Sequence, residues 1–351
     1  MVYSASYIFA EERTGDGFTY IKKQLLFAVM GLFAFIISAR IPHAKWYRLA
    51  PAAVLGVISL LVLVMVPGMG ARAGGAQRWI NFGIFRFQPA ELAKLVGVIF
   101  VARQLVRHQR ELYLFRKGVI APIALLLPIM GLLLLQPDFG STALLAGTTF
   151  ILMYIAGVRA LFLFGGLFGA SAIASALIFF SPYRMARVMT FMDPWRDPAG
   201  KGFQVIQSML GLHNGSLFGQ GLGNGKEKLF FLPEAHNDFI FAVIGEELGF
   251  IGVGAVILAY IFFIFRGLKI SWTALNARQD RFGFYLGCGI SIILGLQAFI
   301  NMAVVMGLLP TKGLTLPLIS YGGSALILNL FALGILYSIS KANHGSFYEI
   351  E

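Results

Sequence analysis

Asp238 is the residue whose type and position most clearly suggest chemistry. It ends the polar stretch Leu232-Pro233-Glu234-Ala235-His236-Asn237-Asp238, which runs directly into a long apolar segment. His236 or Asn237 can cap the helix that follows, which would place Asp238 in the first turn, where the helix dipole favours an ionised carboxylate. Such a carboxylate at a membrane surface can take a proton from a sugar hydroxyl as a general base. The alternative is an acid that only caps the helix.

Two further groups place charges within or beside apolar segments, where charges are costly. Glu91 and Lys94 are three residues apart, so they share a helix face and can pair. They form either a structural ion pair between helices or a pair that lines a polar cavity. Asp138 follows Gln136 and Pro137 at a tight turn, where it can cap the next helix or, as a less favoured alternative, bind a ligand or metal.

Glycine-rich segments and basic residues point to an anionic ligand. The segment 215–228 reads GSLFGQGLGNGKEK, and 307–324 reads GLLPTKGLTLPLISYGGS. Glycine lets a backbone approach a ligand closely and cradle an anion, although flexible loops have the same composition. The second segment predicts broken or re-entrant backbone. Nearby basic residues would meet a lipid diphosphate; they are Arg72, Arg78, Arg86, Lys201, Lys226, Lys228 and Lys312.

The elements that must position these residues are membrane-spanning helices. The chain of 351 residues is 58% hydrophobic and only 13% charged, with a mean hydropathy of +0.78. Inside an apolar bilayer, backbone N–H and C=O groups must form hydrogen bonds with each other, which only helices and closed barrels allow. The sequence lacks the alternating pattern of a barrel, so the spans are predicted to be helices. The predicted fold is all-α and polytopic, with nine full spans at 24–39, 51–67, 89–106, 118–135, 142–156, 160–180, 238–265, 283–305 and 321–340. The apolar residues 1–10 form a stub.

The distribution of Lys and Arg predicts the orientation. The loops near 40–48, 103–117 and 266–281 are richer in these residues than the opposite short loops, so we expect them, and the C-terminus, to be cytoplasmic. Residues 181–237 then form a large extracytoplasmic loop within a single transmembrane domain spanning 1–351. Most of the polar groups described above fall on that outer side.

Composition also bears on other classes of protein. The net charge of +12 comes without any basic nucleic-acid motif, so we expect topology and anionic lipid, and not nucleic acid, to explain it. Cys288 is the single cysteine, which excludes an intrachain disulfide.

These groups resemble the SEDS family, the shape, elongation, division and sporulation proteins. The matching segments are MVYSAS at Met1, FQPAELAKL at Phe87, QPDFGSTALL at Gln136, LPEAHNDFIFAVIGEELGFIG at Leu232 and GLLPTKGLTLPLISYGGS at Gly307. The segments ARAGGAQRWINFG, MDPWRDPAGKGFQVIQSMLGL and PTKGLTLPLISYGG are more similar to its division branch than to its elongation or sporulation branches.

The resemblance implies a ten-helix fold, of which the first helix is expected to be truncated here. It implies a peptidoglycan glycosyltransferase that polymerises lipid II in the cytoplasmic membrane, with a class B penicillin-binding protein and other divisome membrane proteins as partners. The catalytic aspartate of the family's H-x-D-F motif matches Asp238, and its cavity-lining pair matches Glu91 and Lys94. The residues we expect to bind substrate are Glu91, Lys94, Arg78, Asp138, Lys228, Glu234, His236, Lys312 and Ser320.

The expected reaction inverts the donor carbon, with Asp238 as the base. No cofactor is certain; a divalent cation, Mg²⁺ or Mn²⁺, could help the basic residues meet the diphosphate. Two other functions stay open, a lipid II flippase and a non-catalytic scaffold that activates the transpeptidase. A flippase usually has its sites near the midplane, whereas the polar groups here cluster on the outer side.

Overall fold

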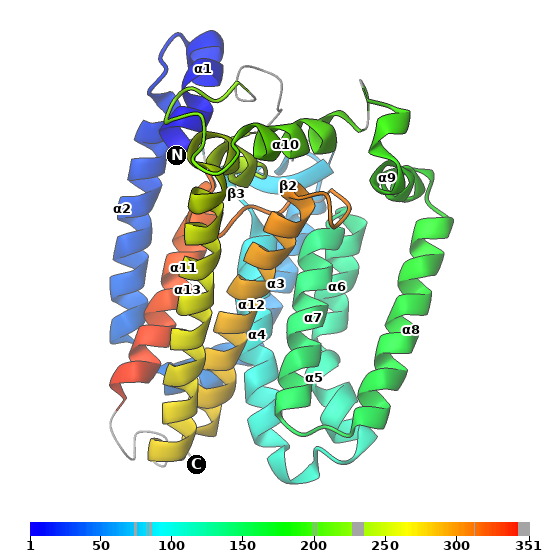
Figure 1. Ribbon diagram of the computed structural model, residues 1–351. Helices are drawn as coiled ribbons and strands as arrows, with labels where there is room; N and C mark the ends of the chain where they lie inside the picture. Colours follow the sequence, from blue (N-terminus) through cyan, green and yellow to red (C-terminus); the bar gives the residue numbers. More distant parts are fainter. Residues whose placement is uncertain are drawn as a thin grey trace. The chain divides into compact units, whose positions relative to one another are not determined.

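Helices occupy all nine predicted spans in the computed structural model (Figure 1), which describes residues 1–73, 76–81, 83, 86–198, 200, 202–226, 235–311 and 313–342. They are α2 (Thr19–Arg40), α3 (His43–Met65), α4 (Pro89–Arg107), the run of η2 (Arg116–Ile120), α5 (Ala121–Ile123) and α6 (Leu126–Leu135), then α7 (Phe139–Ile155), α8 (Ala160–Phe179), α11 (Ile240–Arg278), α12 (Arg281–Val305) and α13 (Gly323–Lys341). The predicted stub is the helix α1 (Val2–Thr14).

Length and apolar character mark these helices as membrane spans. In the described part of the chain, 6 helices are each long and apolar enough to cross a membrane: α2, α3, α8, α11, α12 and α13. The pair Arg116–Ile123 and Leu126–Leu135, bent by 43°, makes up to 7 if it counts as one span. The helix α7 is shorter, and α4 carries Glu91, Lys94 and Arg103 within its span. The prediction of a polytopic, helical membrane protein is confirmed.

Two parts of the structure were not anticipated. The strands β1 (Gly70–Ala73), β2 (Ala76–Asn81) and β3 (Arg86–Phe87) form an antiparallel sheet that packs on α3 and α4. Its strands are too short to show a clear alternating pattern in sequence. The segment predicted as a long outer loop contains the helices α9 (Pro182–Met192) and α10 (Phe203–Asn214), and a single turn of 3-10 helix, η3 (Pro194–Arg196). A second such turn, η1 (Gln109–Glu111), follows α4.

The chain forms two compact units, whose boundaries fall inside α2, α8, α11 and α12 and directly before α13. Unit 1 comprises Met1–Leu26, Leu167–Phe262 and Gln297–Gly322. Unit 2 comprises Phe27–Gly166, Phe263–Leu296 and Gly323–Glu351. The single transmembrane domain expected from sequence stays a prediction.

In unit 2, α4 packs between α3 and α7. Phe100 and Leu105 of α4 are fully buried there, together with Leu61 of α3. A Cβ at Gly97 would lie 2.5 Å from a methyl carbon of Leu145 on α7, so this glycine permits the close approach of α4 and α7. Small residues commonly allow such approaches between membrane helices.

Unit 2 also contains a buried pair, His43 and Asp280, at the start of two helices. Asp280 accepts a hydrogen bond from the Gly283 backbone N–H at 2.8 Å, which caps α12. Its other oxygen lies 2.5 Å from Nε2 of His43, the first residue of α3, and both side chains are buried. The pair ties the beginnings of α3 and α12 together.

In unit 1, the turn between α1 and α2 is held by Asp16. One carboxylate oxygen lies 2.7 Å from Nζ of Lys22, and the other accepts from the Phe18 backbone N–H at 2.9 Å. The hydrogen bond from Lys22 and then that from Phe18 hold the pKa of Asp16 below its ordinary value, because both stabilise the ionised form.

The helix α11 is broken at Gly249, whose φ of 66° and ψ of −164° are outside the helical region. The break leaves backbone groups without helical partners, and the glycine-rich segment after α10 supplies them. Gln220 N–H donates to the Glu246 carbonyl at 2.9 Å and Gly221 N–H to the Glu247 carbonyl at 3.1 Å. Beyond the break, Phe250 N–H donates to the Ser216 carbonyl at 2.9 Å.

This pairing explains Gly215 and Gly219 without an anion. A Cβ at Gly215 would lie 1.9 Å from the Gly245 carbonyl oxygen, and one at Gly219 would lie 2.1 Å from that of Glu247. The segment therefore needs glycine because its backbone lies against the backbone of α11. In Figure 1, α10 runs crosswise to the yellow helix α11 that this segment contacts.

We predict that Gly249→Ala destabilises the protein by about 3 kcal/mol, because that backbone conformation is almost restricted to glycine. A Cβ there would also lie 2.3 Å from the Gly219 nitrogen. The thermal unfolding midpoint of the protein in detergent micelles measures the effect. Gly254→Ala in the same helix is the matched control, since a Cβ there meets nothing within 4 Å. Equal midpoints for the two variants would contradict the prediction.

Candidate functional site

Asp238 lies in the turn of residues 235–239, before α11, and is half-buried. The helix begins at Ile240, so the prediction that Asp238 stands in the first helical turn is wrong by two residues. The chain turns here because its backbone is tied to other segments of unit 1. A carboxylate that is partly shielded yet still accessible suits a group that exchanges a proton with a substrate.

The Asp238 turn is held against the irregular segment between α12 and α13. Nδ2 of Asn301 on α12 donates to the Asp238 carbonyl at 2.7 Å and to the Leu314 carbonyl at 2.6 Å. Tyr321 N–H donates to the His236 carbonyl at 3.0 Å. A Cβ at Gly313 would lie 3.3 Å from Oδ2 of Asp238, so the Gly313 backbone faces the carboxylate.

His236 and Ser320, both predicted to bind substrate, are buried next to this turn. The His236 ring packs against Phe9, Tyr20 and Tyr321, with centroid distances of 5.3, 4.7 and 5.6 Å. Ser320 Oγ accepts from the Leu316 N–H at 2.8 Å. Both side chains therefore hold the shape of the site. Their roles toward substrate stay predictions.

In unit 2, Glu91 and Lys94 form the expected pair. Lys94 Nζ donates to Glu91 Oε1 at 2.8 Å, and the side chains are only 5% and 9% exposed for Lys94 and Glu91. They lie one turn apart at the N-terminal end of α4. Burying both charges costs desolvation free energy, so the ion pair need not stabilise the fold. This agrees with a function for the two side chains other than stability.

Asp138 and Arg78 are used within unit 2 to shape one turn. Asp138 caps α7, because its carboxylate accepts from the Ser141 N–H at 3.0 Å and from Ser141 Oγ at 2.8 Å. The Arg78 guanidinium donates to the carbonyls of Gln136 at 2.8 Å and Pro137 at 2.7 Å. The capping role predicted for Asp138 is confirmed. Two N–H groups of Arg78 are used in hydrogen bonds to backbone carbonyls.

The predicted site residues that the structure describes thus fall into three groups, one in unit 1 and two in unit 2. Asp238, His236 and Ser320 come together in unit 1. Arg78 and Asp138 meet at one turn in unit 2, whereas Glu91 and Lys94 form a separate pair on α4. The predicted residues Lys228, Glu234 and Lys312 lie outside the described residues.

Sequence reasoning missed Asn301 and Gln297. They are amides four residues apart on α12, both 2% exposed, and Gln297 Nε2 donates to the Thr315 carbonyl at 2.9 Å. Two amides on one face of an apolar span are the signal that could have found them.

The described residues offer no group of three or more His, Cys, Asp or Glu side chains that could hold a metal ion. Magnesium is often bound by one or two carboxylates together with substrate phosphates. The expectation of Mg²⁺ or Mn²⁺ stays a prediction.

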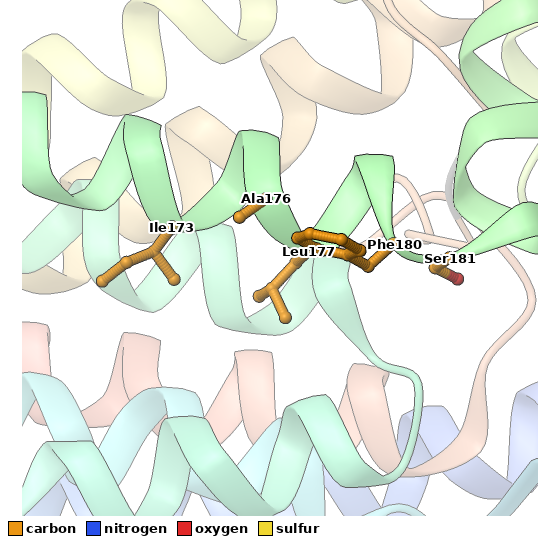
Figure 2. A pocket seen from close by; sticks show the side chains of 5 residues that line it. All are labelled: Ile173, Ala176, Leu177, Phe180 and Ser181. Carbon is orange, nitrogen blue, oxygen red and sulfur yellow. The ribbon is translucent and has the colours of Figure 1, made fainter.

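A pocket of about 290 Å³ lies at the end of α8, lined by Ile173, Ala176, Leu177, Phe180 and Ser181 (Figure 2). Its lining is almost wholly apolar, and Phe180 is 81% exposed. Such a surface suits hydrocarbon and supplies no acid, base or cation for a reaction.

Comparison with known proteins identifies the class. The chain is a multi-pass membrane protein, and residues 1–345 match the model of the family described as cell cycle protein, which comprises FtsW, RodA and SpoVE. The chain belongs to this family, the SEDS family.

Several curated relatives are similar over nearly the full chain. One is the probable peptidoglycan glycosyltransferase FtsW of Geobacter metallireducens, 43% identical over 99% of this chain and 91% of the relative. The protein of the same name from Halorhodospira halophila is 45% identical over 97% and 87%. Stage V sporulation protein E of Bacillus subtilis is 39% identical over 97% and 92%. The prediction of greatest similarity to the division branch, and of a peptidoglycan glycosyltransferase, is confirmed at the level of these relatives.

Solved structures agree in fold. A chain from a structure described as structural coordination of polymerization and crosslinking by a peptidoglycan synthase complex has a TM-score of 0.78 and 30% identity, covering 97% of this chain and 94% of that one. The rod shape determining protein RodA of Thermus thermophilus has a TM-score of 0.69 and 25% identity, with 97% and 93% covered.

We predict that Lys94→Met lowers the free energy of unfolding by about 3–5 kcal/mol, because it leaves the buried Glu91 carboxylate without its ion-pair partner. The double variant Glu91→Leu/Lys94→Met removes both charges and should regain much of that stability. Thermal unfolding in detergent measures both. A double variant less stable than Lys94→Met would contradict a net cost of burying the pair.

Proposed function

We propose that this protein polymerises lipid II into β-1,4 glycan strands by an inverting glycosyl transfer with Asp238 as general base. The observation that carries the proposal is the half-buried Asp238 carboxylate, held beside the Gly313 backbone in a membrane-embedded unit. The names of the relatives, peptidoglycan glycosyltransferase, support the same reaction class.

The chemistry requires one displacement. The donor sugar carries an α-linked lipid diphosphate, and the product bond is β. The acceptor 4-hydroxyl oxygen forms a bond to the donor anomeric carbon while the bond from that carbon to the diphosphate oxygen breaks. Asp238 takes the hydroxyl proton, and the lipid diphosphate leaves with the bonding electron pair. One such step inverts the anomeric carbon.

The leaving diphosphate needs positive charge rather than an acid. Arg78 is one candidate from sequence. Lys226, Lys228 and Lys312 are further candidates from sequence. Mg²⁺ or Mn²⁺ bound to the diphosphate would add positive charge there. Glu91 and Lys94 would line the substrate cavity.

The cellular setting follows from the same assignment. Asp238 would act at the outer face of the cytoplasmic membrane during septal wall synthesis, with the C-terminus on the cytoplasmic side. The solved relative described as belonging to a peptidoglycan synthase complex supports a class B penicillin-binding protein as partner. Other divisome membrane proteins and membrane lipids complete the proposed contacts.

We predict that Asp238→Asn abolishes polymerisation of purified lipid II, because the amide cannot accept the hydroxyl proton. Folding and partner binding should persist, since Asn keeps the shape of the side chain. Glycan products are measured by gel electrophoresis with the purified protein and its partner, in the presence of moenomycin to silence other polymerases. Asp193→Asn, an exposed acid in the segment before α10, is the matched control and should retain activity.

The same assay separates the alternatives. If the Asp238→Asn variant polymerises lipid II at the rate of the wild-type protein, Asp238 is not the general base. A wild-type protein that makes no glycan but moves lipid II across vesicles would be a flippase. One that does neither, while activating the transpeptidase, would be a scaffold.

We also predict that EDTA lowers the polymerisation rate and that added Mg²⁺ or Mn²⁺ restores it, because a divalent cation screens the charge that develops on the diphosphate. The initial rate of glycan formation, with a thermal unfolding control in EDTA, measures this. A rate unchanged by EDTA would leave the diphosphate to Lys and Arg side chains alone.

A further inference from the structure

Asn301 links the Asp238 turn to the irregular segment between α12 and α13. Its Nδ2 donates to two carbonyls, those of Asp238 and Leu314, at 2.7 and 2.6 Å. The amide orientation is fixed, because turning it over would place Oδ1 against both carbonyl oxygens. One side chain thus sets the separation between two segments that are far apart in sequence.

The segment that Asn301 holds cannot keep its shape by itself. Residues 306–322 have no regular structure in their described part, and Leu314 and Leu316 are buried. Side chains supply the partners of its backbone. Gln297 donates to Thr315, the Tyr260 hydroxyl donates to the Pro317 carbonyl, and Ser320 accepts from Leu316 N–H.

The side-chain oxygen of Asn301 is buried in a way that lowers the stability of the fold. Its Oδ1 is buried and has no hydrogen-bond partner among the residues that the structure describes. A buried acceptor without a partner destabilises a fold, and such groups tend to persist where they serve function. Asn301 offsets this destabilisation with its two donated hydrogen bonds, one of which is to the turn that contains Asp238.

We propose that Asn301 is a positioning residue for the glycosyl transfer. Its amide holds the Asp238 backbone against Gly313–Leu316, so that the carboxylate keeps its place beside Gly313 and toward the acceptor hydroxyl. The inference rests on the proposed general-base role of Asp238. Asn301 itself touches no reacting atom.

The test is the isosteric pair Asn301→Asp and Gln297→Glu. Each change removes the donors of one α12 amide and sets a carboxyl group against backbone carbonyls, so both should lower the thermal unfolding midpoint. Only Asn301→Asp releases the Asp238 turn. We expect its kcat for lipid II polymerisation to fall by about 10- to 100-fold, with KM little changed, because misplacement by about 1 Å has effects of that size. Gln297→Glu should lose much less in kcat.

Asn301→Ser covers the case in which the aspartate variant does not fold. Serine keeps a single O–H donor, so its kcat should lie between those of the wild type and Asn301→Asp. Hydrogen exchange of peptides covering 235–239 and 313–316 should rise in this variant. Equal losses of kcat in Asn301→Asp and Gln297→Glu, or an unchanged kcat in the folded Asn301→Ser protein, would overturn the positioning role. Neither result depends on Asp238→Asn, whose activity tests the proposed function separately.

Discussion

A backbone that enters a membrane-embedded protein without regular helix must find hydrogen-bond partners inside the protein, because lipid offers none. Unit 1 meets this requirement twice. The segment between α12 and α13 takes its partners from Gln297, Asn301 and Tyr260. The break of α11 at Gly249 takes them from the glycine-rich segment after α10. Asn301 also joins the Asp238 turn to the first of these segments, so the placement of the candidate base depends on the two hydrogen bonds of that residue.

Buried charge is the second constraint, and the structure treats it in different ways. Asp280 pairs with His43 and also caps a helix, so it has a structural use for each oxygen. Asp138 caps α7 with both oxygens. Glu91 and Lys94 instead pair within one turn of α4, which ties no second helix through that bond. This ion pair is formed between neighbours on one helix face.

Close contact between backbone segments, which glycine permits, is the third constraint. The glycines of residues 215–226 suggested an anion cradle in sequence, yet Gly215 and Gly219 are required by contact with the backbone of α11. The break in α11 that they accommodate, at Gly249, lies nine residues after the helix begins at Ile240. Backbone geometry, and not ligand chemistry, accounts for this part of the composition.

The sequence alone determined the class of the protein, since membrane-spanning helices must be long, apolar runs, and such runs are legible one at a time. It also predicted the Glu91–Lys94 pair and the Asp138 cap, because each depends on neighbours within a few residues. Asp238 as the base stays a prediction from sequence. Tertiary structure decided what depends on contacts between distant residues. Asn301 holds Asp238 across more than sixty positions, His236 is enclosed by rings from α1 and α2, and Arg78 is drawn to the turn before α7. Those partners are set by packing, which no local pattern encodes.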